Sequence, residues 1–295
     1  MNTIKSTILI ICGPTATGKT KLALALAKQF DGELVSADSR QVYKGLDALT
    51  GKDRSKEIPI WLYDVIDVGQ PFNAAHFAFL ARHAIDDIHK RKKLPIVVGG
   101  TGLYLSALTS RVDTLGIPPN TKLREKLSSY SLDLLQEQLQ HIDEIRWLQM
   151  NHSDQKNPRR LIRAIEIAKS GKIYPQEEPL YDALWIGLTT TLRMLQQRIS
   201  KRVQMRWDES AHEVQKNLPP ILGAEPLLAF LRGDSTKKEA LREWTNAEYQ
   251  YAKRQMTWFK KQKNIFWFDV ANEGVYTDIG YLVRTWYTKK DDIED

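Results

Sequence analysis

A phosphate-binding loop stands near the start of the chain. Residues 13–20 read Gly-Pro-Thr-Ala-Thr-Gly-Lys-Thr and match the pattern G-x-x-x-x-G-K-T. The glycines let backbone N–H groups face an anion, and a helix that starts here adds the positive end of its dipole. Lys19 can then reach a phosphate chain, and the Thr20 hydroxyl can hold Mg²⁺. The motif predicts binding of a nucleotide such as ATP or of another diphosphate, and leaves open a kinase, an NTPase and a transferase. The predicted phosphate site comprises Gly13, Pro14, Thr15, Ala16, Thr17, Gly18, Lys19 and Thr20.

An acidic residue follows the next apolar run along the chain. Residues 33–37 are mostly apolar, and Asp38 comes directly after them, followed by Ser39, Arg40 and Gln41. A carboxylate at this place can serve as a general base, as a metal ligand or as the cap of a turn. The sequence leaves these three roles open.

A third apolar run, residues 94–98, ends in Gly99, Gly100 and Thr101. Many NTPases with a phosphate-binding loop end such a strand in an aspartate that helps to hold the metal. Glycines allow a close backbone approach, but they supply no carboxylate. The pattern therefore weighs against ATP hydrolysis, although a plain tight turn would explain the two glycines equally well.

The elements that position these residues alternate between strands and helices. We expect strands at 7–12, 33–37, 94–98, 184–188 and 265–269, and helices at 21–30, 74–90, 192–206, 227–231, 237–261 and 278–287. This alternation predicts an α/β fold, with a parallel sheet like that of the P-loop NTPases flanked by helices. The carboxyl ends of parallel strands meet at one edge of the sheet, so the three motifs should converge there.

The middle of the chain has a different pattern. Helical periodicity recurs at 123–127, 132–142 and 157–169 with no strand between. We predict an inserted all-helical domain at 118–182, within a core made of residues 1–117 and 183–295.

Composition narrows the class of protein. Formal net charge is +7, and basic residues gather in segments 157–164, 189–206 and 251–261. Each segment alone could be a solvated helix face, but three of them, one interleaved with aromatics, favour a long polyanion such as RNA. The single cysteine, Cys12, excludes an intramolecular disulfide or a Cys-rich zinc site. No apolar run is long enough to span a bilayer and the first residues lack a signal-peptide pattern, so we expect a cytoplasmic protein.

Five segments occur in a characteristic order along nearly the whole chain. They are residues 13–20, 38–43 (Asp-Ser-Arg-Gln-Val-Tyr), 99–104 (Gly-Gly-Thr-Gly-Leu-Tyr), 158–166 (Pro-Arg-Arg-Leu-Ile-Arg-Ala-Ile-Glu) and 252–259 (Ala-Lys-Arg-Gln-Met-Thr-Trp-Phe). Together they resemble the bacterial tRNA dimethylallyltransferases. This resemblance implies an enzyme, a monomer, that moves a dimethylallyl group from dimethylallyl diphosphate to the exocyclic amine of the adenosine 3′ of the anticodon, with Mg²⁺.

The resemblance also implies roles for individual residues. Lys19 would stabilise the departing diphosphate, Asp38 would accept the proton of the amine, and Thr101 would contact the target nucleotide. The metal ligand would be Thr20. The residues expected to bind the tRNA anticodon stem-loop are Asp38, Ser39, Arg40, Gln41, Thr101, Arg124, Arg159, Arg160, Arg163, Lys253 and Arg254.

The sequence departs from the family pattern in three places. Leu192 stands where members carry an arginine that touches the diphosphate, so Arg193, one position on, is the candidate replacement. The family's Gly-Thr-Ala-Lys-Pro reads Leu-Thr-Gly-Lys-Asp at 49–53, and its Ile-Gly-Tyr-Lys-Glu reads Leu-Gly-Ala-Glu-Pro at 222–226. Three alternatives follow: an adenylate isopentenyltransferase acting on free nucleotides, a catalytically weakened tRNA-binding relative, and a small-molecule kinase.

Overall fold

The computed structural model describes residues 6–109, 116–171, 180–214 and 218–294, with side chains up to residue 288. The chain divides into two compact units. The first comprises residues 1–110 and 179–295, and the second comprises residues 111–178. Residues 1–5, where a targeting signal would begin, lie outside the described part. Among the described residues, no helix is both long and apolar enough to cross a membrane.

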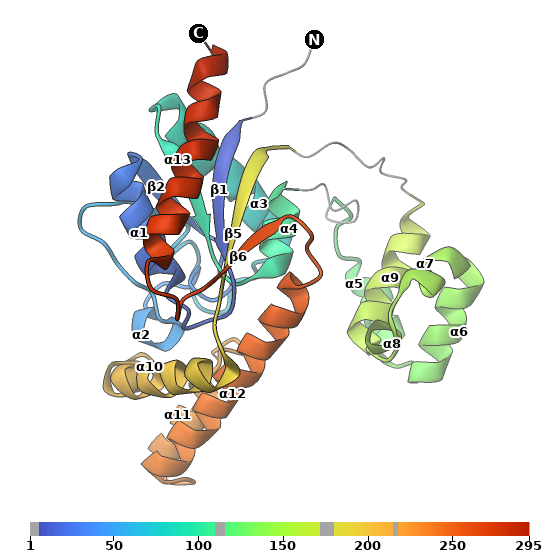
Figure 1. Ribbon diagram of the computed structural model, residues 1–295. Coiled ribbons are helices and arrows are strands. Elements are labelled where there is room, and N and C mark those ends of the chain that lie inside the picture. The colour runs from blue at the N-terminus through green and yellow to red at the C-terminus, as the bar shows by residue number, and fades with distance from the viewer. Residues whose placement is uncertain (1–5, 110–115, 172–179, 215–217, 295) are drawn as a thin grey trace. The chain divides into compact units, whose positions relative to one another are not determined.

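A six-stranded parallel sheet forms the centre of the first unit (Figure 1). Its strand order is β3-β2-β4-β1-β5-β6, and every adjacent pair runs parallel. The bounds are β1 Thr7–Cys12, β2 Gly32–Ser36, β3 Ile60–Trp61, β4 Leu94–Val98, β5 Asp182–Thr189 and β6 Ile265–Asp269. β1, β2 and β4 are buried almost throughout, as expected for strands covered on both faces. The predicted α/β fold is confirmed.

Helices cover both faces of this sheet. Helices α1 (Lys19–Gln29) and α13 (Val275–Glu294) pack on one face, where Leu22, Leu26 and Ile279 join the strands in one apolar core. Helices α3 (Ala74–Lys90) and α4 (Gly102–Thr109) pack against each other, and α3 also contacts β2 and β4. The Asn73 side chain caps α3 by accepting hydrogen bonds from two backbone N–H groups, which explains its sharp start.

A second apolar core lies among α10 (Leu192–Glu213), α11 (Ala224–Leu231), α12 (Lys237–Phe259) and the short α2 (Asp47–Thr50). It surrounds Trp244 and Trp207, which are buried. The prediction that the basic helix ends near Arg206 is wrong, since α10 continues for two more turns and buries Trp207 and Ser210. This core attaches the α10–α12 layer to the segment that follows β2.

The second unit consists of helices alone. They are α5 (Thr121–Ser128), α6 (Leu132–Ile142), α7 (Glu144–Gln149), α8 (His152–Gln155) and α9 (Pro158–Ser170). Each helix begins after an Asn, Ser or Asp whose side chain accepts a hydrogen bond from a first-turn N–H. Leu127, Leu139, Leu161 and Ile165 are fully buried between them. The strand β5 begins at Asp182, inside the first unit, whereas the sequence placed this residue in the insertion.

Candidate active site

The phosphate-binding loop connects β1 to α1 at the carboxyl edge of the sheet. Gly13 has φ 130° and lies so close to β5 that an added Cβ would stand 2.3 Å from the Leu188 carbonyl oxygen. Gly18 adopts the left-handed conformation immediately before α1. Both glycines are therefore required by the path of the backbone.

Side chains of the loop brace it from within. The buried Thr17 hydroxyl donates a hydrogen bond to the Pro14 carbonyl at 2.9 Å, and Lys19 Nζ donates to the same oxygen at 2.8 Å. Burial lowers the pKa of Lys19 to about 8, and the nearby Arg202 cation adds to this effect, while Asp38 and Asp53 oppose it. The lysine ammonium is thus held where an incoming anion would stabilise it.

A buried glutamine links the loop to the turn after β4. Gln255 Oε1 accepts a hydrogen bond from the Thr15 N–H at 2.9 Å, and its Nε2 donates to the Gly100 carbonyl at 2.9 Å. A Cβ on Gly100 would stand 2.1 Å from that Nε2 atom, so the glycine is needed for the contact. Sequence analysis missed Gln255 as a site residue, because it considered the segment only for its cations. The available signal was a neutral amide set among Lys253, Arg254 and Trp258.

The turns after β2 and β4 are joined in the same way. Thr101 Oγ1 accepts a hydrogen bond from the Ser39 N–H at 3.1 Å, and the Thr101 N–H donates to the Ala37 carbonyl at 3.2 Å. Gly99 would clash with Ala37 if it carried a Cβ, since that atom would lie 2.2 Å from the carbonyl oxygen. Asp38 and Thr101 are consequently held on neighbouring turns at one edge of the sheet.

Asp38 performs one of the roles left open by the sequence. Its Oδ1 accepts a hydrogen bond from the Arg40 N–H at 2.9 Å, so it caps the turn. The same carboxylate also lines the cavity described below. The cap therefore fixes the direction of the carboxylate and does not remove it from the site.

An aromatic side chain of α12 completes this side of the site. Tyr251 lies with its ring 4.0 Å from the Arg40 guanidinium carbon, and its hydroxyl is hydrogen-bonded to Thr101. Burial raises the pKa of Tyr251, and the Asp38 charge adds to the rise. The hydroxyl therefore stays protonated and can position neighbouring groups.

Arginines of α10 reach the phosphate-binding loop. Arg202 Nη1 donates a hydrogen bond to Thr15 Oγ1 at 2.7 Å, and its Nη2 donates to the Gly51 carbonyl at 2.9 Å. Arg206 lies 3.4 Å from Glu248, and burial, together with Arg202, lowers its pKa to about 10. Arg198 also lines the cavity, one turn before Arg202.

The structure does not bring Arg193 to the loop. Arg193 is exposed in the first turn of α10 and does not line the cavity. It precedes Arg202 by nine positions, and at about 100° per residue it lies on the opposite side of the helix. The arginine that touches the loop in this chain is therefore Arg202.

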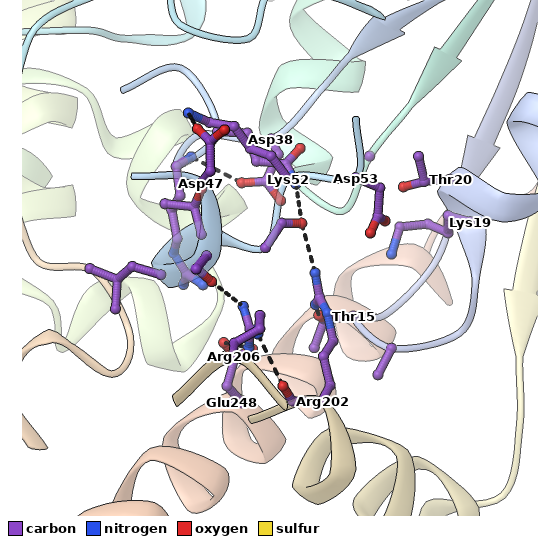
Figure 2. A pocket seen from close by; sticks show the side chains of 18 of the residues that line it. Thr15, Lys19, Thr20, Asp38, Asp47, Lys52, Asp53, Arg202, Arg206 and Glu248 are labelled. Atoms are coloured by element: carbon purple, nitrogen blue, oxygen red, sulfur yellow. Dashed lines mark hydrogen bonds and ion pairs between the residues drawn. The ribbon is translucent and has the colours of Figure 1, made fainter. Parts of the chain in front are cut away.

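These groups surround one cavity of about 780 Å³ in the first unit (Figure 2). Eight basic and five acidic side chains line it, so its charge favours an anion. Of the predicted residues, the cavity lining includes Thr15, Ala16, Gly18, Lys19, Thr20, Asp38, Arg40 and Gln41. Ser39 and Thr101 lie beside it through their mutual hydrogen bond.

A Mg²⁺ ion fits the oxygen donors of this cavity. The Thr20 hydroxyl and the carboxylates of Asp38 and Asp53 line it. Within the described part of the chain, no group of three or more His, Cys, Asp or Glu side chains is arranged to hold a metal. Mg²⁺ commonly uses one or two carboxylates and completes its shell with substrate phosphates and water, so the donor set suits a metal that arrives with a phosphate.

The predicted tRNA-binding arginines of the second unit are used unequally. Arg124 and Arg163 form ion pairs with the buried Glu166, and Arg160 pairs with Asp154. Burial alone would raise the pKa of Glu166, but its hydrogen bonds, with that from Arg124 the strongest, lower it to about 2. Arg159 is exposed, and among the described residues it makes no ion pair.

The last two predicted residues lie on α12. Lys253 and Arg254 are exposed, and their cationic groups lie 5.8 Å from the rings of Tyr249 and Tyr251 respectively. They follow one another on the helix and precede Gln255. Their position places two cations next to the residue that links the phosphate-binding loop to Gly100.

The loop at the carboxyl edge of a parallel sheet, together with a cationic cavity, defines a P-loop α/β protein with an anion-binding site. A family model described as IPP transferase matches residues 41–262, and one described as isopentenyl transferase matches residues 6–61. The chain belongs to the IPP transferase family, and the resemblance seen in the sequence is confirmed.

Named relatives and solved structures agree. The chain is 38% identical to a tRNA dimethylallyltransferase of Anoxybacillus flavithermus, covering 91% of this chain and 92% of that one. It is 36% identical to a tRNA dimethylallyltransferase of Streptococcus pneumoniae, covering 92% and 95%. The structure of a tRNA isopentenylpyrophosphate transferase from Bacillus halodurans matches with a TM-score of 0.72 at 32% identity, covering 98% and 99%. A eukaryotic dimethylallyltransferase acting on tRNA matches with a TM-score of 0.80 at 27% identity, covering 98% of this chain and 80% of that one.

Proposed function

We propose that this protein transfers a dimethylallyl group from dimethylallyl diphosphate to N6 of the adenosine 3′ of the anticodon in tRNA, releasing diphosphate. One observation carries the proposal: the phosphate-binding loop and the turn that bears Asp38 line the same cavity. A leaving diphosphate and a proton acceptor are the two groups that such a transfer needs. The names of the curated relatives agree with this reaction.

The loop side of the cavity would bind the donor. Backbone N–H groups of the loop, the start of α1, Lys19 and Arg202 all offer positive charge to the diphosphate. As the bond between the dimethylallyl carbon and the diphosphate oxygen breaks, its electron pair leaves with the diphosphate, whose growing charge these groups stabilise. Mg²⁺, held by the Thr20 hydroxyl together with phosphate oxygens, supplies further neutralisation of that charge when bound.

The Asp38 side would direct the acceptor. The exocyclic amine of adenine is a weak nucleophile, so it needs a fixed direction and a place for its proton. The amine nitrogen forms the new bond to the dimethylallyl carbon, and the Asp38 carboxylate takes the proton that is lost. Because the Arg40 N–H holds Oδ1 at 2.9 Å, the other carboxylate oxygen is available for this purpose.

The tRNA would present its base by taking it out of the stack. Ser39, Thr101 and Arg40 lie at the Asp38 side of the cavity and are suited to hold the extruded nucleotide. The exposed cations Lys253 and Arg254, with Arg159 of the second unit, would contact the phosphate backbone. All groups of the proposed donor site come from one chain, so we propose a monomer that acts on tRNA in the cytoplasm.

The test is a transfer assay with labelled dimethylallyl diphosphate, Mg²⁺ and unmodified tRNA. We expect label on the tRNA with the wild type. We expect none with Asp38→Ala, which should still bind tRNA in a filter assay. A matched control is Asp67→Asn, an exposed residue paired only with Lys44. Absence of label with the wild type on any tRNA would contradict the proposal. Label on free AMP instead would indicate the adenylate-modifying alternative, and tRNA binding without turnover would indicate a weakened relative.

A further inference from the structure

The carboxyl edge of the sheet lacks an acidic residue at the place where many P-loop proteins have one. Strand β4 lies beside β1 and ends in Gly99 and Gly100, which carry no carboxylate. In P-loop NTPases the metal is held by the Ser or Thr of the loop together with an aspartate at this position. The Thr20 hydroxyl therefore needs a carboxylate from another part of the chain if the metal is to have a second protein ligand.

Asp53 enters the cavity on the segment that follows α2. The residues before it are firmly held: the Gly51 carbonyl accepts hydrogen bonds from Arg202 at 2.9 Å and from Gln41 at 3.0 Å. Lys52 is buried and donates to Asp47 at 2.8 Å and to Asp64 at 2.6 Å. Asp53 thus follows two anchored residues and has a defined position.

A tyrosine holds Asp53 from the other side. The Tyr63 side chain is hydrogen-bonded to the backbone of Asp53, and it lines the same cavity. Burial raises the pKa of Tyr63, and the charges of Asp53 and Asp38 add to the rise, so its hydroxyl remains a neutral donor. The Asp53 backbone is therefore fixed, and its side chain is left to face the cavity.

The carboxylate of Asp53 is unused by the fold. The neighbouring acids Asp47 and Asp64 are both occupied by Lys52 and Arg54. In contrast, the Asp53 side chain is exposed and, among the described residues, forms no ion pair or side-chain hydrogen bond. In Figure 2 it points toward the Thr20 hydroxyl and the Lys19 ammonium, and its charge acts on Lys19.

We propose that Asp53 is a protein ligand, with Thr20, of the divalent cation that accompanies the diphosphate. Hydroxyl and carboxylate oxygens are the donors that Mg²⁺ prefers, and one carboxylate plus phosphate oxygens is a common set. This assignment leaves Asp38 free to accept the proton of the amine. It rests on the proposed function only in taking a diphosphate as the charged part of the donor.

The test uses Mn²⁺ as the probe, with inorganic diphosphate and protein whose aspartates carry ¹³C in the side-chain carboxyl. Electron–nuclear double resonance detects a ¹³C coupling when a carboxylate binds Mn²⁺ directly. We expect this coupling in the wild type and in the control Asp67→Asn, and we expect it to vanish in Asp53→Asn. The affinity for Mn²⁺ in the presence of diphosphate should fall by about tenfold or more in Asp53→Asn and Asp53→Ser.

Two results would overturn the assignment. The first is the absence of a ¹³C coupling in the wild type. The second is a coupling that survives in Asp53→Asn and disappears in Asp38→Asn, which would make Asp38 the ligand and leave Asp53 as a counter-charge for Lys19. Since the probe is inorganic diphosphate, these readouts are independent of tRNA. A wild type that binds Mn²⁺ through Asp53 but labels no tRNA would contradict the proposed function alone.

Discussion

Gln255 Oε1 accepts a hydrogen bond from the Thr15 N–H at 2.9 Å, although the two residues are 240 positions apart in the chain. The other end of the same amide donates to the Gly100 carbonyl. A single side chain of α12 thus fixes the phosphate-binding loop against the turn after β4. The helix that carries Lys253 and Arg254 is thereby connected directly to the loop that would bind the donor.

Gln255→Leu should weaken donor binding and destabilise the first unit. It leaves the Thr15 N–H and the Gly100 carbonyl without their partner, and each buried polar group left unpaired costs about 1–3 kcal/mol. The Michaelis constant for dimethylallyl diphosphate should rise, and the denaturation midpoint should fall. Gln255→Glu is the matched comparison, because it keeps the acceptor for Thr15 and loses only the donor to Gly100. Equal Michaelis constants for wild type and Gln255→Leu would show that the link is not needed for donor binding.

Removal of Arg202 should impair donor binding, whereas removal of Arg193 should not. Arg202 touches Thr15 of the loop at 2.7 Å, and Arg193 is exposed on the far side of α10. A charged hydrogen bond is worth about 1.5–3 kcal/mol, which corresponds to roughly a tenfold to hundredfold change in affinity. The binding of inorganic diphosphate to Arg202→Ala and Arg193→Ala can be compared by calorimetry. A larger loss in Arg193→Ala would contradict the arrangement seen here.

The second unit should lose stability in acid through Glu166. Its pKa is lowered to about 2 in the folded state, so its ion pairs stabilise the fold fully above the ordinary carboxyl pKa near 4.5 and are lost as the pH falls toward 2. At one pH unit per 1.4 kcal/mol, the contribution at neutral pH is of the order of 3 kcal/mol. Urea denaturation of Glu166→Gln and wild type should differ at pH 7 and converge near pH 2. Glu125→Gln, an exposed change on α5, should leave stability unchanged at either pH.

The parts of the fold that were predictable are those that local pattern determines. The strand, loop and helix around residues 13–20 follow from β-branched residues, glycines and helical spacing, and α3 was predicted with its bounds because Asn73 and a clear apolar stripe define it. The pattern could not reveal β3, which has only two residues, or α4, whose apolar residues lie on all sides and show no period.

The site residues divide in the same way. Lys19 and Asp38 were found because each belongs to a short motif at the end of a strand. Gln255 was missed because its role depends on contacts with Thr15 and Gly100, which only the folded chain brings together. Arg193 was chosen over Arg202 by proximity to an expected position, and the turn of the helix reverses that choice.

The arginines of the second unit should differ in how they affect tRNA. Arg159 is exposed and makes no ion pair within the described residues, so it is available to a phosphate, while Arg124 is occupied by Glu166. Arg159→Ala should weaken tRNA binding and reduce the slope of log affinity against log salt by about 1, with the denaturation midpoint unchanged. Arg124→Ala should lower the denaturation midpoint, because it leaves a buried carboxylate with fewer partners. Its salt slope should stay closer to that of the wild type. Filter binding of tRNA across a salt series, paired with urea denaturation, separates the two effects. A salt slope lowered by Arg124→Ala and not by Arg159→Ala would instead assign the phosphate contact to the arginine that faces Glu166.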